Sequence, residues 1–345
     1  MKYKLYTTSQ KAWDGMLKAI RLAKHSIYLE MYIFLDDIRE THDFLGLLKA
    51  KARAGIEVVI IADAFGSASL KGLAVKELKS AGIEFIYFSH WFRRLHRKIL
   101  IIDNRIAFLG GVNIEEKIRH WRDLQIGVSG RIVKPLLKSF ALIYKKVGGR
   151  KENILKYSRL PLVQKLKSWI TDNFSAASKL YYLNEYYRTR IAAAKKSIKI
   201  VTPYLLPPRW LLARLDEACR RNVQVDIIIP EDTDVKPLNK INYLNACRMS
   251  AFGINFFRLP FMNHAKLMLI DDEEGVIGSQ NMDILSFNLN MEAGVFFRQK
   301  GLVDDLRRIV EHWKNEAVFF KVPFRSIKLS DRIFIGIFKI FYPIF

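Results

Sequence analysis

HRKILIIDNRIAFLGGVN, residues 96–113, decides the fold, because it returns 168 residues later as HAKLMLIDDEEGVIGSQN, residues 264–281. Three further pairs of segments recur in the same order: 19–34 with 190–205, 51–63 with 217–230, and 78–88 with 248–260. Four elements repeated in one order indicate that the chain is an internal duplication.

Each copy alternates apolar strand patterns with helical patterns of about 10 to 15 residues. This alternation predicts an α/β sandwich in each half, with a largely parallel or mixed sheet covered by helices, and two halves that face each other. We expect a first half over 1–150, a basic bridge over 151–180, a second half over 181–322, and a basic, apolar tail over 323–345.

The composition limits the classes of partner. Lysine and arginine outnumber acidic residues 57 to 34, and the formal net charge is +23. An anionic partner is therefore expected, either nucleic acid or an anionic membrane surface. Two cysteines, Cys219 and Cys247, give no disulfide framework and indicate a reducing compartment. Without an apolar leader or a run of about 20 apolar residues, we expect neither a cleaved signal nor a spanning helix.

Two apolar segments each leave two interpretations open. The bridge either lies on a membrane or, as is more usual, packs on the domain, through Leu162, Leu166, Trp169 and Ile170. The tail from Ile333 to Phe345 is either an interfacial segment or an element packed on the core, and it follows Arg325, Lys328 and Arg332.

The repeated stretch carries a histidine and a lysine two residues apart, a spacing that directs both side chains to one face of a strand. The pairs are His96 with Lys98 and His264 with Lys266. A lone histidine on a strand is more often structural. Two copies, each followed twelve residues after the lysine by a glycine turn, instead favour a catalytic role.

The glycine turns predict a phosphate site. Backbone amides in such turns can hold an anion, and neutral side chains add donors. The candidates for phosphate binding are Gly111, Asn113, Ser279 and Asn281. Lys98 and Lys266 would supply the charge that stabilises developing negative charge on the phosphoryl oxygens.

Two histidines near one phosphorus predict a division of labour. A neutral imidazole can attack while a protonated one donates to the leaving oxygen, which gives a covalent phosphohistidine. The seven histidines form no cluster at metal-ligand spacing, so we expect no metal and no cofactor.

Four carboxylates accompany the motifs. Asp103 and Asp271 lie seven residues after their histidines on what reads as a continuous strand, hence on the opposite face and about 23 Å away, so we expect them to be structural residues at the strand end. Asp123 and Glu292 open the strands that follow, 27 and 28 residues beyond the histidines. We expect these two to orient the imidazoles.

Together these residues resemble the paired HKD motifs of the phospholipase D superfamily. The first copy has Gly111 where many members have serine. With the following WRD and the opening segment 19–34, it is most similar to bacterial cardiolipin synthases, and the resemblance spans roughly residues 5–320.

The resemblance implies two phospholipase-D-type α/β sandwich halves with the active site at their interface and a phosphohistidine intermediate. It implies transfer of a phosphatidyl group from phosphatidylglycerol or a similar donor to a phosphatidylglycerol hydroxyl, with His96 as nucleophile and His264 as general acid and base. It also implies a peripheral protein on the cytoplasmic face of a bacterial membrane, with no obligate protein partner. Unlike the longer synthases, this sequence shows no N-terminal transmembrane helices, which leaves membrane attachment to basic charge and the tail.

Three alternatives use the same motifs: a nuclease, a phospholipase D hydrolase, and a non-catalytic membrane-binding protein. A nuclease predicts a basic cleft and steeply salt-dependent binding, whereas a lipid enzyme predicts an apolar entry and dependence on a lipid surface. The apolar tail and the first motif favour lipid, and two complete motifs argue against a non-catalytic protein.

Overall fold

The computed structural model describes residues 1–70, 72–161, 168–172, 182–320 and 328–342. The chain divides into two compact units. The first is Met1–Phe174 with Ile277–Ser279 and Met291–Val295, and the second is Ser175–Val276, Gln280–Asn290 and Phe296–Phe345. Two short pieces of the second repeat thus belong to the first unit, and they carry two candidate site residues, Ser279 and Glu292.

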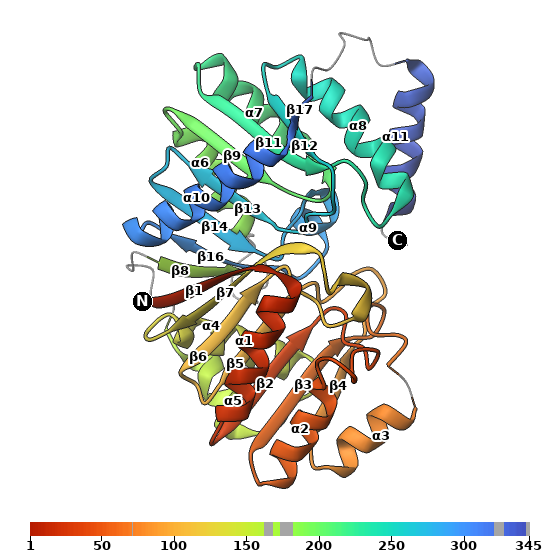
Figure 1. Cartoon of the computed structure of the whole chain (residues 1–345), viewed down its shortest axis with the longest axis vertical. Helices are drawn as coiled ribbons and strands as arrows, with labels where there is room; N and C mark the ends of the chain where they lie inside the picture. The colour runs from red at the N-terminus through yellow and green to blue at the C-terminus, as the bar shows by residue number, and fades with distance from the viewer. Residues whose placement is uncertain (71, 162–167, 173–181, 321–327, 343–345) are drawn as a thin grey trace. The chain divides into compact units, whose positions relative to one another are not determined.

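Among the described residues of the first unit, seven strands form the sheet, in the order β1-β7-β6-β5-β2-β3-β4 (Figure 1). They are β1 (Lys2–Thr8), β2 (Ser26–Met31), β3 (Glu57–Asp63), β4 (Glu84–Phe88), β5 (Lys98–Ile102), β6 (Ile106–Gly110) and β7 (Arg122–Ser129). Strands β2, β3 and β4 are parallel, and the other neighbours are antiparallel. The predicted mixed sheet is confirmed.

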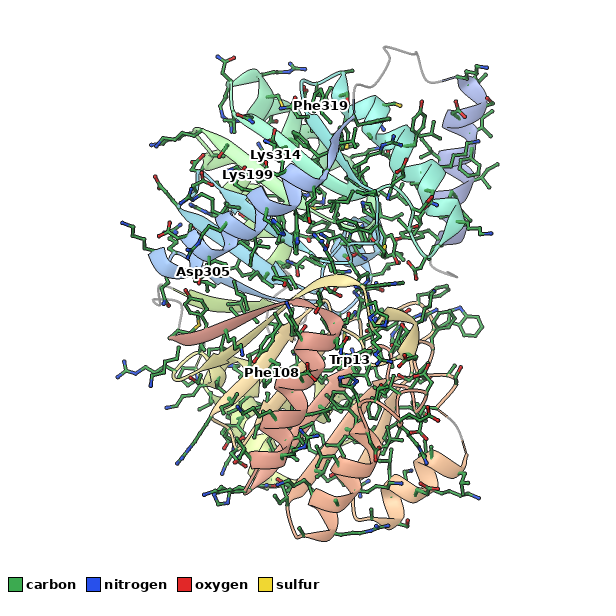
Figure 2. The ribbon with its side chains drawn as sticks, viewed as in Figure 1. Trp13, Phe108, Lys199, Asp305, Lys314 and Phe319 are labelled. Atoms are coloured by element: carbon green, nitrogen blue, oxygen red, sulfur yellow. The ribbon has the colours of Figure 1, made fainter. Side chains whose placement is uncertain are left out.

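Helices cover both faces of this sheet. They are α1 (Ser9–Leu22), α2 (Phe44–Arg53), α3 (Leu73–Ser80), α4 (Val133–Lys146) and α5 (Glu152–Leu155), with 3₁₀ turns η1 (Glu116–Ile118) and η2 (Lys156–Arg159). Trp13 of α1 and Phe108 of β6, both labelled in Figure 2, share one buried cluster with Leu29 of β2. The next side chain along β2, Tyr28, points the other way and stacks on Phe140 of α4 at 5.2 Å. Because successive side chains of a strand point to opposite faces, β2 contributes to an apolar layer on each side of the sheet.

The sheet of the second repeat has the order β17-β12-β11-β9-β13-β14-β16-β8. Its strands are β8 (Ser168–Asp172), β9 (Ser197–Val201), β11 (Gln224–Pro230), β12 (Asn255–Leu259), β13 (Leu267–Ile270), β14 (Glu274–Gly278), β16 (Ala293–Phe297) and β17 (Val318–Phe319). The run β12-β11-β9-β13-β14-β16 matches β4-β3-β2-β5-β6-β7 strand for strand. The duplication read from the sequence is therefore confirmed at the level of topology.

In the part of the second unit that the structure describes, there are also a short parallel pair and six helices. The pair is β10 (Leu205–Leu206) with β15 (Met282–Asp283). The helices are α6 (Tyr182–Ala193), α7 (Arg209–Arg220), α8 (Lys236–Ser250), α9 (Ile284–Asn288), α10 (Lys300–Glu316) and α11 (Leu329–Phe341). Two lysines labelled in Figure 2 tie α10 to the sheet: Lys314 contacts Asp226 of β11 at 2.6 Å, and Lys199 of β9 contacts Glu311 at 2.9 Å.

The tail packs on the second unit and leaves one face exposed. α11 lies beside α8 (Figure 1), with Ile335, Phe338 and Tyr342 buried in a cluster that includes residues of α8. Leu329, Ile333 and Ile337, spaced one helical turn apart, stay exposed. No helix among the described residues has both the length and the apolar character needed to cross a bilayer.

Several side chains named in the two apolar segments lie outside the described residues. In the bridge these are Leu162, Leu166 and the side chains of Trp169 and Ile170, and near the tail they are Arg325 and the side chain of Arg332.

Candidate active site

His96 lies two residues before the start of β5, and a buried carboxylate at the end of β3 fixes the backbone beside it. Asp63 Oδ2 accepts a hydrogen bond from the backbone N–H of Leu95 at 2.7 Å. Its Oδ1 accepts from the N–H groups of Phe65 and Gly66 at 3.0 and 2.9 Å. Burial raises the pKa of Asp63, and these backbone hydrogen bonds act in the opposite direction. Asp63 therefore joins the segment that carries His96 to the turn after β3.

The imidazole of His96 contacts a carboxylate 196 positions away in the chain. His96 Nδ1 lies 2.9 Å from Oε1 and 3.1 Å from Oε2 of Glu292, whose side chain is completely buried. Glu292 is held there because the backbone N–H of Met291 donates to the carbonyl of Arg94 at 2.8 Å. The hydroxyl of Ser279 also donates to Glu292 Oε2.

Electrostatics favour the ionised form of this carboxylate. Burial by itself would raise the pKa of Glu292, but the adjacent His96, the charge of Lys98 and the hydroxyl of Ser279 lower it below its usual value. An ionised carboxylate accepts the proton of Nδ1–H, which fixes the tautomer and the orientation of the ring. Sequence spacing selected Glu292 as an orienting residue, and the structure supplies its partner, His96.

Gly111 and Ser279 occupy the same place in the two motifs but accommodate their carboxylates differently. A Cβ atom at Gly111 would overlap Oδ1 of Asp123. Glycine in the first copy therefore makes room for Asp123, whereas in the second copy a serine hydroxyl bonds the longer Glu292. The role of Asp123 toward an imidazole stays a prediction.

The two lysines are buried and adopt one local geometry. Lys98 Nζ donates to the carbonyl of His96 at 2.8 Å, and Lys266 Nζ donates to the carbonyl of His264 at 2.5 Å. A buried ammonium is costly unless an anion compensates it. For Lys98, the ionised Glu292 is close enough to contribute, because the charge of Lys98 lowers the pKa of that carboxyl.

A tyrosine accompanies each histidine, and sequence reasoning did not select either one. The ring of Tyr32 meets that of His96 edge-on at 4.9 Å, and Lys98 Nζ lies 4.9 Å from the Tyr32 ring centroid. Tyr204 meets His264 in the same manner at 6.2 Å. Burial raises the pKa of Tyr32, which keeps its hydroxyl protonated at neutral pH. The signal available in the sequence was that both tyrosines fall in the repeated segments 19–34 and 190–205.

Arg97, which was also missed, forms a buried ion pair. Its Nε lies 2.9 Å from Glu30 Oε2, with both side chains fully buried, and it donates to Ser139 Oγ of α4 at 2.8 Å. The second copy has Ala265 at the equivalent position. The sequence signal was a glutamate inside the otherwise apolar strand β2.

Gly111 and Ser279 are the two turn residues whose backbone was expected to bind phosphate. The N–H of Gly111 donates to Leu124 O at 3.1 Å and that of Ser279 to Ala293 O at 3.0 Å, so both amides take part in strand pairing. The Ser279 hydroxyl bonds Glu292. The phosphate-binding role expected of Gly111 and Ser279 stays a prediction.

Asn113 and Asn281 are both buried at the ends of their motifs. The indole N–H of Trp13 donates to Asn113 O at 2.8 Å (Figure 2 labels Trp13), and the N–H of Asn281 donates to Ser286 Oγ at 3.0 Å. These bonds fix the two backbones. Phosphate binding by their side chains stays a prediction.

Asp103 and Asp271 occupy hairpin turns that directly follow β5 and β13, at the strand ends where the sequence placed them. Asp103 and Asn104 have φ of 49° and 56°, and Asp271 and Asp272 have 55° and 53°. Two successive positive φ values are typical of a type I′ turn, which reverses the chain at this point.

The carboxylates of these turns bond to backbone. That of Asp103 accepts from the N–H groups of residues 24–26, and that of Asp271 from those of 195–197, at 2.7 to 3.2 Å. Each ties its hairpin to the start of a neighbouring strand.

A duplicated mixed-sheet sandwich with a His-Lys pair at the head of the same strand in each copy defines a protein of the phospholipase D fold. Solved structures with this fold include phosphatidylserine synthase from Haemophilus influenzae, at a TM-score of 0.74 and 14% identity over 99% of this chain and 93% of that one. Polyphosphate kinase from Porphyromonas gingivalis gives a TM-score of 0.64 at 14% identity, over 98% of this chain and 53% of that one. At such identities the likeness shows the fold alone.

Sequence comparison gives the family. The chain belongs to the family described as cardiolipin synthase, PLD-like domain, whose model matches residues 16–131 and 187–313. Relatives include a probable cardiolipin synthase of Bacillus subtilis, 28% identical over 91% of this chain and 65% of that protein, and cardiolipin synthase 1 of Staphylococcus aureus, 32% identical over 87% and 64%. A cardiolipin synthase of Halalkalibacterium halodurans is 30% identical over 92% and 69%. The chain thus spans about two thirds of the length of these relatives, and the family expected from the motifs is confirmed.

Proposed function

We propose that the chain is a phosphatidyltransferase that makes cardiolipin and glycerol from two molecules of phosphatidylglycerol. The observation that carries the proposal is the buried hydrogen bond between His96 Nδ1 and Glu292, because a carboxylate that fixes an imidazole prepares its other nitrogen for attack. The cardiolipin synthases among the relatives support the choice of substrate.

In the first step, Nε2 of His96 attacks the phosphorus of one phosphatidylglycerol. The bond from phosphorus to the headgroup glycerol oxygen breaks, and His264 gives that oxygen its proton. Glycerol leaves, and the phosphatidyl group stays on His96 as a phosphohistidine. Glu292 stabilises the positive charge that the imidazole acquires.

In the second step, the headgroup hydroxyl of another phosphatidylglycerol attacks the same phosphorus. His264, now neutral, takes the proton of that hydroxyl, and the bond between His96 and phosphorus breaks. Lys98 and Lys266 compensate the charge on the phosphoryl oxygens, and Asn113 and Asn281 donate hydrogen bonds to them. The product is cardiolipin, and both histidines return to their starting protonation states.

We further propose that the protein works as a peripheral protein on an anionic membrane surface, on the cytoplasmic face of a bacterial cell. The formal net charge of +23 supports attraction to anionic lipid. The exposed apolar stripe of α11, preceded by the exposed Lys328, supports a surface that lies at an interface.

The alternatives are hydrolysis of the phosphohistidine by water, and cleavage of nucleic acid. The positive net charge supports the nuclease alternative, because a basic protein binds phosphodiester backbones as well as anionic lipid.

Purified protein incubated with phosphatidylglycerol vesicles, beside His96→Ala and His264→Ala variants, separates these functions by mass spectrometry. Cardiolipin and glycerol formed only by the intact protein are expected. Phosphatidic acid without cardiolipin would make the chain a hydrolase, and cleaved single-stranded DNA with unchanged lipid would make it a nuclease.

A further inference from the structure

Three large aromatic side chains are exposed close to His96. Trp91 and Phe92, in the loop between β4 and β5, are 83% and 61% exposed, and Phe65, in the turn after β3, is 48% exposed. We call these three residues the aromatic edge. Trp91 lies five positions before His96, so the aromatic edge adjoins the candidate nucleophile along the chain.

The aromatic edge is held in place. Asp63 binds the N–H of Phe65 on one side and that of Leu95 on the other, so one carboxylate fixes both segments. The guanidinium of Arg94 lies over the ring of Phe65 at 4.2 Å. The Trp91 and Phe92 rings meet edge-on at 6.0 Å. Exposed aromatic rings on a fixed base are pre-organised for binding, which lowers the entropic cost of association.

Basic groups adjoin the aromatic edge. Arg93 and Arg94 follow it directly in the chain. Lys146, at the end of α4, has its pKa lowered first by partial burial and then by the charge of Arg93, which places these two cations near each other. A partner of the aromatic edge must therefore combine an apolar layer with negative charge.

We infer that the aromatic edge docks the chain on a bilayer containing anionic phospholipid, with Trp91 and Phe92 in the interfacial layer and Arg93 at the phosphates. The inference rests on the proposed function, because it places the lipid surface next to His96. Tryptophan partitions to the boundary between headgroups and acyl chains, and anionic headgroups attract the adjacent arginines. Single-stranded nucleic acid also stacks on aromatic residues beside arginine, and binding to it is an outcome of the test.

Vesicle binding of the full chain tests the docking. Trp91→Ser/Phe92→Ser is compared with Leu22→Ser/Leu73→Ser, a control that removes two side chains exposed to 67% and 72% outside the aromatic edge. On vesicles of equal parts phosphatidylcholine and phosphatidylglycerol, we expect the first variant to bind on the order of tenfold or more weaker per lost side chain, and the control to bind as wild type. Equal binding by both variants would overturn the inference.

Quenching of tryptophan fluorescence shows whether Trp91 enters the bilayer. Vesicles with brominated acyl chains should quench wild-type emission more than that of Trp91→Phe, because only the wild type carries an indole at position 91. Equal quenching of the two proteins overturns the inference. Loss of single-stranded DNA binding in Trp91→Ser/Phe92→Ser with unchanged vesicle binding also overturns it, in favour of nucleic acid.

Turnover distinguishes a failed docking surface from a failed enzyme function. The ratio of activity on phosphatidylglycerol vesicles to activity on soluble bis-p-nitrophenyl phosphate should fall at least tenfold in the aromatic-edge variant, in step with its weaker vesicle binding. An unchanged ratio overturns the docking. If wild type turns over neither substrate, the proposed function fails, and vesicle binding and quenching still decide the docking by themselves.

Discussion

Replacing Glu292 with glutamine should reduce turnover while leaving the fold intact. Glutamine has nearly the same shape but no charge, so it removes the ionic part of the contact between Nδ1 and the two carboxylate oxygens at 2.9 and 3.1 Å. A hydrogen bond to a charged group contributes about 1.5–3 kcal/mol, and loss of the orienting carboxylate in a related constellation costs about 10⁴ in rate. Since Glu292 is fully buried and water cannot replace it, we expect kcat to fall by about 10²–10⁴.

The assay is release of p-nitrophenol from soluble bis-p-nitrophenyl phosphate, with a thermal melt of each variant. Ser279→Ala removes only the hydroxyl that bonds Glu292 Oε2 and should cost about tenfold. Glu40→Gln, at an exposed position, is the matched control and should match wild type. A kcat for Glu292→Gln within about threefold of wild type, in a protein that melts normally, would refute the orienting role.

Three further predictions concern stability. Gly111→Ser should destabilise the fold by about 1–3 kcal/mol in urea unfolding because the new Cβ overlaps Asp123, and adding Asp123→Ala should recover most of that loss. Arg97→Ala should lower the free energy of unfolding by about 3–5 kcal/mol, because it removes the cation that pairs with the buried Glu30. Removing both charges with Arg97→Met/Glu30→Leu should lower it far less. Equal losses in the two variants would contradict a coupled pair. The pKa of Glu292 is lowered from 4.5, so its ionisation stabilises the folded state above that pH. The unfolding free energy of wild type relative to Glu292→Gln should therefore shrink as the pH falls below about 4.5, and a difference independent of pH between 6 and about 3 would contradict this.

Repetition and periodicity let the sequence predict most of the fold. Local side-chain pattern is enough to recognise strands, whose apolar residues alternate or run together, and helices, whose apolar residues recur with the helical period. It is also enough to recognise that these elements recur at one offset. The mixed sheet and the internal duplication followed from that pattern. The sequence placed each histidine on the strand itself, whereas β5 begins at Lys98 and β13 at Leu267, so both histidines precede their strands.

Long-range partners could not be predicted in this way. Spacing selected Glu292 but not its partner, because the contact joins residues 196 positions apart and depends on how Met291 pairs with Arg94. The backbone amides of Gly111 and Ser279 take part in strand pairing, which the motif alone did not indicate.

By itself, then, the sequence determined the duplication, the α/β class and the identity of the two His-Lys pairs, because these features depend on the order of nearby residues and on the recurrence of whole segments. Only the tertiary structure decided which carboxylate holds which imidazole, that Arg97 and Glu30 meet inside the core, and that Trp91 and Phe92 stay exposed beside His96. The physical reason is that burial and hydrogen-bond pairing are properties of the packed chain, and local pattern does not encode the partner of a given side chain.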